Sequence, residues 1–515
     1  MFRTRIYNHF PHAPMSTTIT RRHFMKTSTG AVLGSILANS VVGESASRRR
    51  PNLLFVFSDQ QSADMLGCYG NASIETPRLD AFSRGAVRFN HCISNSPVCT
   101  PYRGTLLSGQ HPLYHGAFFN DLQMLPGDGT YFAEVLRDAG HRTGYVGKWH
   151  LLGGYRDRPV PEGPLRYGFD DTFLTNNCTL EYRAGKSWYW DRNNQRAFYP
   201  KWEPDAQTDQ AIEFLEQSVG RDDPWTLFVS WHPPHNWDGY WNYDAPKAFK
   251  DLYDPDTIKL RPGTPDTPEN RRMMRDYHAL CSNLDWNFGR LLDALEEQGE
   301  LDNTIVVYTS DHGDCLRMNG RYDLHKCRPE QESTKVPLLI RAPGLRGGTS
   351  DLLVSSLDLM PTLLGLLGAS VPGTCQGQNL SRAIKNGDED AVASIPLFLS
   401  RFDDIDWRGV YTRRYTYSFG PDGERFNRLY DRQEDPHEQN NLFDDPAHRG
   451  VRNRLHRETL RWMKEFNDPF VPYQKMLEAT ATQPAKDGKM FRQPTGALKG
   501  RPVDRIRGMK GYGMR

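Results

Sequence analysis

The sequence has few cysteines for its 515 residues, no long apolar run and almost no net charge. Its eight cysteines, with no pair at the spacing of a zinc knuckle, exclude a disulfide framework and a structural zinc module. The apolar stretch at residues 30–42 is shorter than the roughly 20 residues that span a membrane, which argues against a transmembrane helix there. We find no internal repeats, and a mean hydropathy of −0.68 is typical of a soluble globular protein. We expect most of the cysteines to be small buried side chains.

The net charge of +1 conceals an uneven distribution along the chain. Residues 1–46 carry five basic side chains and one acidic side chain, and residues 485–515 carry nine basic and two acidic. The remaining 438 residues therefore have a net charge of −10. An acidic body argues against nucleic acid as a partner, because phosphate binding needs a basic face on the folded domain. We predict that residues 471–515 form a basic, flexible tail.

The N-terminal segment has the order of an export signal. Arg21, Arg22, Phe24 and Lys26 precede the apolar stretch, and small residues follow it as far as Ala46. This order resembles a twin-arginine signal, whose route exports folded proteins. Residues 1–46 are therefore predicted to be a cleaved signal for a periplasmic or secreted protein with no stable membrane anchor. A chance arginine pair before a short anchor is the alternative.

Unbroken apolar runs alternate with helical stretches from the end of this signal to about residue 394. Each run suits a strand that helices cover on both faces. The predicted strands are 53–58, 143–146, 226–230, 304–309 and 336–340. The predicted helices are 77–85, 131–139, 205–219 and 271–297. This alternation predicts an α/β fold with a large, mostly parallel sheet flanked by helices over residues 47–394.

Beyond residue 395 the pattern changes to short alternating segments, VYTRRYTYSF and then RLYDR, followed by a helical stretch at 449–466. Alternation with period two is typical of antiparallel strands that have one buried face. We therefore predict a smaller C-terminal α+β subdomain over residues 395–470. The long segment 183–202, rich in Trp, Tyr and Asn, is expected to be a loop.

Polar side chains follow four of the predicted strands at their carboxyl ends, where open α/β sheets bind their ligands. They are Asp59, Gln60, Lys148, His150, His232, His235, Asp311 and His312. Each residue alone has an ordinary structural interpretation, such as an aspartate that caps a turn. Together, at one edge, they indicate a common site. Two carboxylates, an amide oxygen and an imidazole form an oxygen-dominated ligand set, which favours Ca2+ or Mg2+ over zinc.

Cys99 begins the segment CTPYRGTLLSG, residues 99–109. Pro101 is typical of the first turn of a helix, so Cys99 would lie at the amino end, where free N–H groups favour an anion. Arg103 lies one turn on and can fold back toward Cys99. The residues alone leave an activated thiolate as one interpretation. The spacing Cys-x-Pro-x-Arg, followed by Leu-Leu-Ser-Gly, resembles the signature of type I sulfatases of the alkaline phosphatase superfamily, in which this cysteine is oxidised to formylglycine.

Other segments resemble the same family along most of the chain. They are residues 52–59 and 66–70, GKWH at 147–150, HPPH at 232–235, SDHG at 310–313, Lys326 seven residues before Ser333, DLMPTLL at 358–364, LYD at 429–431 and DPHE at 435–438. Gly104 departs from the commoner Ser or Ala. Gln60 stands where many sulfatases have a second Asp, and Gln60→Asp is expected to be tolerated because it restores that arrangement.

The resemblance implies a role for each matching residue. The implied catalytic residues are Cys99 as formylglycine, Arg103, Lys148, His150, His235, Asp311 and Lys326. The implied ligands of a Ca2+ ion, with Mg2+ as the second choice, are Asp59, Gln60, Cys99, Asp311 and His312. Hydrated formylglycine would attack sulfur after losing a proton to Asp311, His235 or Lys326 would protonate the departing alcohol, and His150 would then release sulfate. A formylglycine-generating enzyme is the implied partner.

The leading hypothesis is an exported sulfatase that acts on a sulfated carbohydrate. The alternative is a phosphonate or phosphate mono- or diester hydrolase that uses the same site, because Gln60 also occurs in such relatives. A third hypothesis is a non-catalytic exported binding protein. Aromatic residues between 188 and 202, interleaved with Arg and Lys, could stack on sugars and meet their anionic groups, or they could form an ordinary packed loop.

Overall fold

The largest element of the structure is a sheet of eleven strands. The computed structural model describes residues 49–124, 126, 129–236, 242–320, 324–401, 405–479, 482–484 and 490–492. The predicted signal and most of the predicted basic tail lie outside these residues. Within the described part of the chain, no helix is long and apolar enough to cross a membrane. All eight cysteines are free, and six are buried, as expected from the sequence.

The strand order of the large sheet is β11-β2-β10-β8-β1-β7-β3-β4-β5-β6, and β9 pairs with β2. Their bounds are β1 Asn52–Asp59, β2 Val87–Ile93, β3 Arg142–Lys148, β4 Thr172–Asn176, β5 Trp188–Trp190, β6 Arg196–Phe198, β7 Trp225–Pro234, β8 Thr304–Ser310, β9 Lys335–Val336, β10 Leu338–Arg341 and β11 Gly348–Ser355. The five central strands, from β8 to β4, are all parallel. This confirms the predicted large, mostly parallel sheet.

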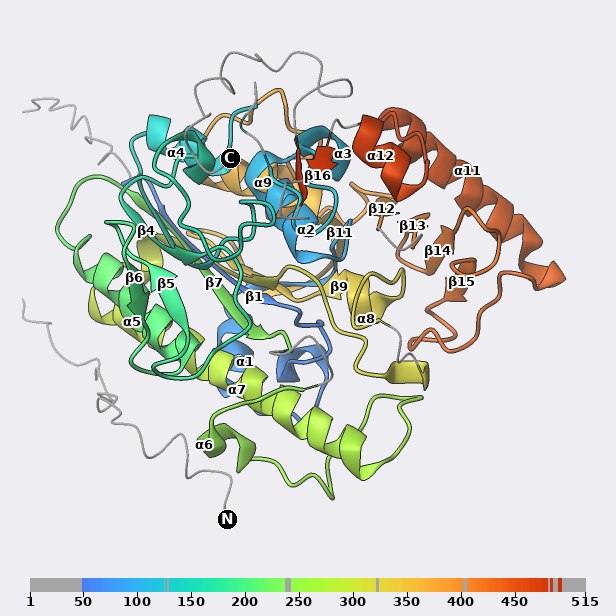
Figure 1. Ribbon diagram of the computed structural model, residues 1–515, viewed down its shortest axis with the longest axis horizontal. Helices are drawn as coiled ribbons and strands as arrows, with labels where there is room; N and C mark the ends of the chain where they lie inside the picture. Colours follow the sequence, from blue (N-terminus) through green and yellow to red (C-terminus); the bar gives the residue numbers. More distant parts are fainter. Residues whose placement is uncertain are drawn as a thin grey trace, which may run out of the picture. The chain divides into compact units, whose positions relative to one another are not determined.

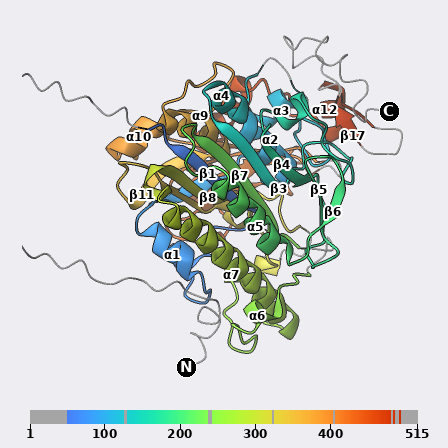
Figure 2. The ribbon, with the colours of Figure 1, turned by 90° about the vertical axis from the view of Figure 1, so that its left-hand side faces the viewer.

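Helices cover both faces of the sheet, which explains the unbroken apolar runs (Figure 1). Along β1, Leu54 and Val56 face a cluster that includes α1 (Pro77–Ser83), α5 (Glu203–Glu216) and α7 (Pro268–Glu297). Leu53, Phe55 and Phe57 face the opposite cluster, with α2 (Cys99–Ser108), α4 (Phe132–Asp138) and α9 (Ser356–Leu367). Figure 2 shows α5 and α7 lying along one face of the central strands. Because side chains of a strand alternate between faces, a strand between two helical layers is apolar at every position.

The C-terminal part forms a second, four-stranded antiparallel sheet, as predicted. Its strands are β12 Ile395–Leu399, β13 Trp407–Tyr411, β14 Tyr415–Phe419 and β15 Arg428–Asp431. Helix α11 (Arg449–Glu465) packs on it, with Leu455 against Val410, Tyr417 and Leu429. The predicted boundaries of the subdomain at residues 395 and 470 stay predictions.

The remaining elements are short. They are the helices α3 Pro112–His115, α6 Lys247–Lys250, α8 Gln331–Thr334, α10 Ser381–Asn386 and α12 Tyr473–Ala479, the 3-10 helices Gly67–Tyr69, Pro164–Arg166, Leu301–Asn303, Met318–Gly320 and Pro446–His448, and the strands β16 Thr482–Pro484 and β17 Met490–Arg492.

Two local expectations differ from the structure. The predicted strand 336–340 is divided at Pro337 into β9 and β10, and both pair antiparallel. The segment expected to be a loop contains the hairpin β5–β6, which extends the sheet. Asp191 stabilises its turn because its carboxylate accepts hydrogen bonds from the backbone N–H groups of Asn193 and Gln195, at 2.9 and 2.8 Å. Asn194 adopts the left-handed conformation, with φ of 56°, that asparagine tolerates.

Candidate active site

The polar residues predicted from the strand ends converge in the structure. Strands β1, β3, β7 and β8 are parallel neighbours, so the segments that follow them meet at one edge of the sheet. Cys99, the first residue of α2, and Lys326, from the loop after β8, reach the same place. The sequence placed the polar residues at this edge because they follow strands, and it singled out Cys99 and Lys326 from their motifs. The structure brings Asp59, Lys148, His312 and Lys326 into contact with Cys99.

The Sγ atom of Cys99 lies at the centre of this group. It is 3.3 Å from His312 Nε2, 3.3 Å from Lys326 Nζ, 3.6 Å from Asp59 Oδ1 and 3.7 Å from Lys148 Nζ. Burial and the Asp59 carboxylate disfavour the thiolate, but Lys148, Lys326 and His312 together hold the pKa of Cys99 well below its ordinary value. The group is therefore arranged to stabilise negative charge at this position.

Four side chains offer ligand atoms that all lie within 4.8 Å of one another: Asp59, Cys99, Asp311 and His312. All four are buried. The predicted fifth ligand, Gln60, has a buried Oε1 atom that accepts no hydrogen bond from the described residues. Oxygen atoms dominate this set, and an amide oxygen without a partner needs a cation or a donor. The residues therefore fit a hard divalent cation.

Arg103 joins the two carboxylates of this cluster. Its Nη2 donates to Asp59 Oδ2 at 3.1 Å and to Asp311 Oδ2 at 3.2 Å, and its Nη1 donates to the Lys148 carbonyl and the Ser230 hydroxyl. The residue is 1% exposed. Arg103 thus contacts both carboxylates from α2 and is placed to orient them.

Two lysines form the cationic side of the site, and one of them contacts the histidine His235. Lys148 Nζ donates to Asp59 Oδ2 at 2.5 Å, and Lys326 Nζ lies 3.0 Å from His235 Nε2. The Nδ1 atom of His235 lies 2.7 Å from the carbonyl oxygen of Asn236, to which it can only donate. Burial and the Lys326 ammonium lower the pKa of His235 well below its ordinary value. His235 is thus a neutral ring whose Nε2 accepts from Lys326.

His150 occupies a different environment. Its Nε2 lies 3.3 Å from Asp121 Oδ1, and Arg156 donates to both oxygens of that carboxylate, at 2.9 and 2.8 Å. Burial opposes a charged ring, but the neighbouring Cys178 and the hydrogen bond to Asp121 raise the pKa of His150 to about 10. Asp121 and Cys178 were not found by sequence reasoning, since neither follows a predicted strand or belongs to a recognised motif.

His232 lies beside this group with both ring nitrogens buried and without a hydrogen-bond partner among the described residues. Its ring packs edge-on against Tyr182, with centroids 5.2 Å apart, and lies 5.5 Å from the His235 ring. Burial and Lys148 lower the pKa of His232 well below its ordinary value, so the ring is neutral.

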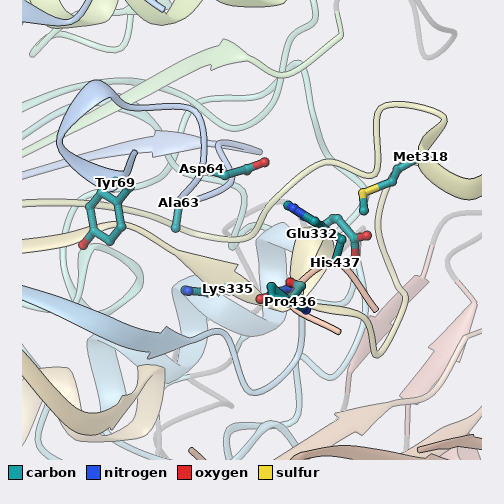
Figure 3. Close-up of a pocket in the computed structure, with 9 residues that line it drawn as sticks. Ala63, Asp64, Tyr69, Met318, Glu332, Lys335, Pro436 and His437 are labelled. Carbon is teal, nitrogen blue, oxygen red and sulfur yellow. The ribbon is translucent and has the colours of Figure 1, made fainter. Parts of the chain in front are cut away.

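A separate pocket of about 270 Å3 lies between the loop after β1, the helix α8 and the C-terminal subdomain (Figure 3). Asp64, Tyr69, Lys335 and His437 are among the residues that line it. Its lining contains none of the site residues predicted from the sequence. The pocket is therefore distinct from the cluster around Cys99.

Known proteins are similar to this chain in sequence and in fold. The family model described as Sulfatase matches residues 51–369, and one described as N-sulphoglucosamine sulphohydrolase, C-terminal, matches residues 320–465. An Ulvan-active sulfatase of Formosa agariphila is 33% identical over 432 residues, which cover 82% of each chain.

Solved structures agree with these matches. A structure of the putative sulfatase yidJ from Bacteroides fragilis has 29% identity and a TM-score of 0.75, and the match covers 83% of this chain and 98% of that chain. One from Bacteroides thetaiotaomicron, reported with the metabolism of multiple glycosaminoglycans, has 26% identity and a TM-score of 0.73, covering 83% and 99%. A phosphonate monoester hydrolase of Silicibacter pomeroyi, at 20% identity and a TM-score of 0.64 over 85% and 98%, shares the fold alone. Because the Sulfatase model spans more than half of the chain, this protein belongs to the sulfatase family, with the alkaline phosphatase-like fold, and is a sulfuric ester hydrolase.

Proposed function

We propose that the protein is an exported sulfatase that hydrolyses sulfate esters of a carbohydrate, with formylglycine at position 99. The observation that carries this proposal is the position of Cys99 Sγ, at the start of α2 and within 3.3–3.7 Å of Lys326, Lys148 and His312. These groups neutralise negative charge where a sulfate group would bind. A formylglycine-generating enzyme would read the Cys-x-Pro-x-Arg spacing, and the hydrated aldehyde would supply the attacking hydroxyl.

The proposed cation is Ca2+, with Mg2+ as the second choice. Asp59, Gln60, Asp311 and His312, with the side chain at position 99, would hold it, because carboxylate and amide oxygens are ligands of hard cations. Such an ion supplies Lewis acidity beside the nucleophile.

The side chains around position 99 would have three further roles in the reaction: neutralising charge, protonating the leaving group and releasing sulfate. Lys148 and Lys326 would bind the sulfuryl oxygens and neutralise their charge as it develops. Lys326 and His235 are joined by one hydrogen bond, so the proton between Lys326 Nζ and His235 Nε2 is available to the departing alcohol. His150 Nε2 donates to the Asp121 carboxylate, so His150 in its neutral form would take a proton at Nδ1 in the step that releases sulfate.

A carbohydrate substrate is supported by the hairpin β5–β6 and by the relatives. The Arg196 guanidinium lies 4.3 Å from the ring centroid of Trp188 and 5.0 Å from that of Trp190. Aromatic rings with a nearby cation suit an anionic sugar. The Formosa relative is named for ulvan, and the Bacteroides structure is reported with glycosaminoglycans.

The second candidate is hydrolysis of phosphonate or phosphate esters. Gln60 favours it, because an amide makes the cation site less anionic than a second Asp, and the fold of a phosphonate monoester hydrolase is similar. Competition between p-nitrophenyl sulfate and a p-nitrophenyl phosphodiester separates the two candidates. The sulfatase proposal requires the larger kcat/KM on the sulfate.

Peptide mass spectrometry tests the modification directly. The peptide that contains residue 99 should show the thiol sulfur replaced by an aldehyde oxygen, and Cys99→Ala should abolish turnover without unfolding the protein. Unmodified Cys99 in fully active protein would contradict the proposal. A panel of sulfated mono- and oligosaccharides then identifies the sugar and the sulfate position.

Export by the twin-arginine route rests on residues 1–46, which lie outside the described residues. Replacing Arg21 and Arg22 by Lys in the full-length protein should leave it in the cytoplasm, which cell fractionation measures. Undiminished export of that variant would exclude this route.

A further inference from the structure

The side chain of Gln60 is held in one orientation. Its Nε2 donates to Asp314 Oδ2 at 2.5 Å and to Asn236 Oδ1 at 3.3 Å. A carboxylate accepts hydrogen bonds and does not donate them, so the atom facing Asp314 is the amide nitrogen. The amide oxygen is therefore turned away from Asp314, and it is the buried Oε1 that accepts no bond from the described residues.

Asp314 is itself fixed as an acceptor on both oxygens. Its Oδ2 also accepts from the Tyr243 hydroxyl at 2.5 Å, and its Oδ1 accepts from the Leu316 backbone N–H at 2.9 Å. The residue is fully buried, and its backbone N–H donates to Ser62 Oγ. A carboxylate held in this way needs a donor from position 60, and Gln is the residue present.

The backbone at Gln60 supports the same arrangement. Its φ of 70° is in the left-handed region, which is uncommon for a residue other than glycine. The N–H of Gln60 donates to Asp311 Oδ1 at 3.0 Å, and its carbonyl accepts from the Tyr277 hydroxyl at 2.6 Å. Main chain and side chain are thus both fixed at this position.

We propose that Asp314 is the positioning residue of the cation site: it binds the amide nitrogen of Gln60 and thereby directs the amide oxygen to the cation. Residues 60 and 314 act as an amide–carboxylate pair, in which one member supplies the N–H donor that the other needs. This inference rests on the cation site proposed above. It goes against the expectation from the sequence that Gln60→Asp is tolerated, because an aspartate has no N–H to donate to Asp314.

An acidic side chain at position 60 would weaken cation binding because it would meet the carboxylate of Asp314. With Glu at position 60, two carboxylates would face each other across the gap that the Nε2–Oδ2 hydrogen bond now closes. Extra negative charge alone would strengthen cation binding. The amide–carboxylate pair predicts weaker cation binding, because the ligand oxygen loses its orientation. The two explanations therefore predict opposite changes in cation affinity for Gln60→Glu.

Gln60→Glu, Asp314→Asn and the double variant provide the test. The double variant exchanges amide and carboxylate between the positions and keeps the net charge of the wild type. Asp285→Asn is the matched control, because Asp285 is also fully buried and accepts backbone N–H bonds, from Arg78 and Leu79 at the start of α1.

Titration calorimetry with CaCl2 on full-length, EGTA-treated protein measures affinity, with MgCl2 in parallel, and melting in EGTA measures the fold. Loss of an outer partner of a metal ligand typically weakens binding about 10- to 100-fold, which we expect for each single variant. The double variant should regain affinity, so the two changes are non-additive. Asp285→Asn should melt earlier in EGTA but keep the affinity of the wild type.

The other possible outcomes would contradict either the positioning role of Asp314 or the cation site itself. If Gln60→Glu binds the cation more tightly than wild type, or if Asp314→Asn binds it equally well, Asp314 does not position Gln60. If both single variants bind weakly and the double variant recovers nothing, Asp314 only stabilises the loop after β8. Wild-type protein that binds neither ion would refute the proposed cation site itself. Should Asp314→Asn fail to fold, the sign of the change in Gln60→Glu still decides.

Discussion

At the scale of single residues, His235 and His150 differ in their hydrogen-bond partners. The neutral ring of His235 shares a proton with Lys326, whereas His150 is bound to the Asp121 carboxylate and has a pKa raised to about 10 against the effect of burial. His235 therefore accepts from a cationic donor, Lys326, whereas His150 donates to an anionic acceptor, Asp121. This difference supports separate roles for them in the reaction.

His235→Ala should impair substrates with poor leaving groups most. A sugar alkoxide needs a proton in order to depart, whereas nitrophenolate does not, and a general acid is typically worth about 10²- to 10⁴-fold in rate. We expect a loss in that range for a sugar sulfate and a much smaller loss for p-nitrophenyl sulfate. Measuring kcat/KM of wild type and variant on both substrates checks this. Equal losses on both would remove His235 from leaving-group protonation.

His150→Ala should release one equivalent of nitrophenol quickly and then stall, because only the release of sulfate would be slowed. Stopped-flow mixing with p-nitrophenyl sulfate measures the burst. Asp121→Asn should show a burst with a smaller decrease in the later rate, since His150 keeps its ring but loses the anion that orients it. A decrease in rate without a burst would show that His150 acts before or during the attack on sulfur.

At the scale of elements, helix α2 explains why Gly104 departs from the family signature. A Cβ atom at this position would lie 2.5 Å from Cε1 and 2.7 Å from Nδ1 of the buried His115 ring. That ring cannot easily move, because its nitrogens contact the Thr105 hydroxyl and the Ala117 N–H, each at 3.2 Å. Glycine is therefore required by a neighbour outside the signature.

Gly104→Ala should destabilise the protein although alanine is the better helix former. Alanine gains about 1 kcal/mol in helix propensity over glycine, but overpacking a buried site typically costs about 1–3 kcal/mol. We expect a lower denaturant midpoint for Gly104→Ala than for the wild type. In the His115→Ala background, where the ring is absent, the same change should lower the midpoint less. A midpoint above that of the wild type would show that the ring moves aside at little cost.

At the scale of the whole molecule, Glu438 connects the C-terminal subdomain to helix α8, which precedes strand β9 of the main sheet. Its buried carboxylate accepts from the Gln331 backbone N–H at 2.7 Å and from the Thr416 hydroxyl. Burial and the nearby Glu332 carboxylate raise the pKa of Glu438 to about 7, although Arg432 opposes this shift. The carboxyl group thus titrates near neutral pH at the junction of the two sheets.

This shift predicts that stability falls as the pH rises. The folded protein holds the Glu438 proton more tightly than the unfolded chain, whose pKa is about 4.3, so the contribution is present below that value and is lost as pH rises through about 7. Glu438→Gln should remove part of the decrease in melting temperature between pH 5 and 7.5. The exposed Glu424→Gln is the control and should keep the slope of the wild type. Equal slopes in wild type and Glu438→Gln would contradict the prediction.

The sequence by itself determined the features that depend on local pattern. Unbroken apolar runs indicated strands between two helical layers, and residues after those runs had to meet because parallel strands end at one edge of a sheet. The segment at residues 99–109 indicated both a helix start and a family. These features depend on residues that are close together in the sequence, so the sequence is enough to predict them.

Only the tertiary structure decided which side chains hold the site residues in place. Gln60 and Asp314 are 254 positions apart, and Asp121 reaches His150 from a segment with no motif of its own. Gly104 is required by the ring of His115, through a contact between α2 and α3. A hydrogen bond needs its atoms within about 3 Å at a suitable angle. That condition depends on how the elements pack, so no local pattern in the sequence records it.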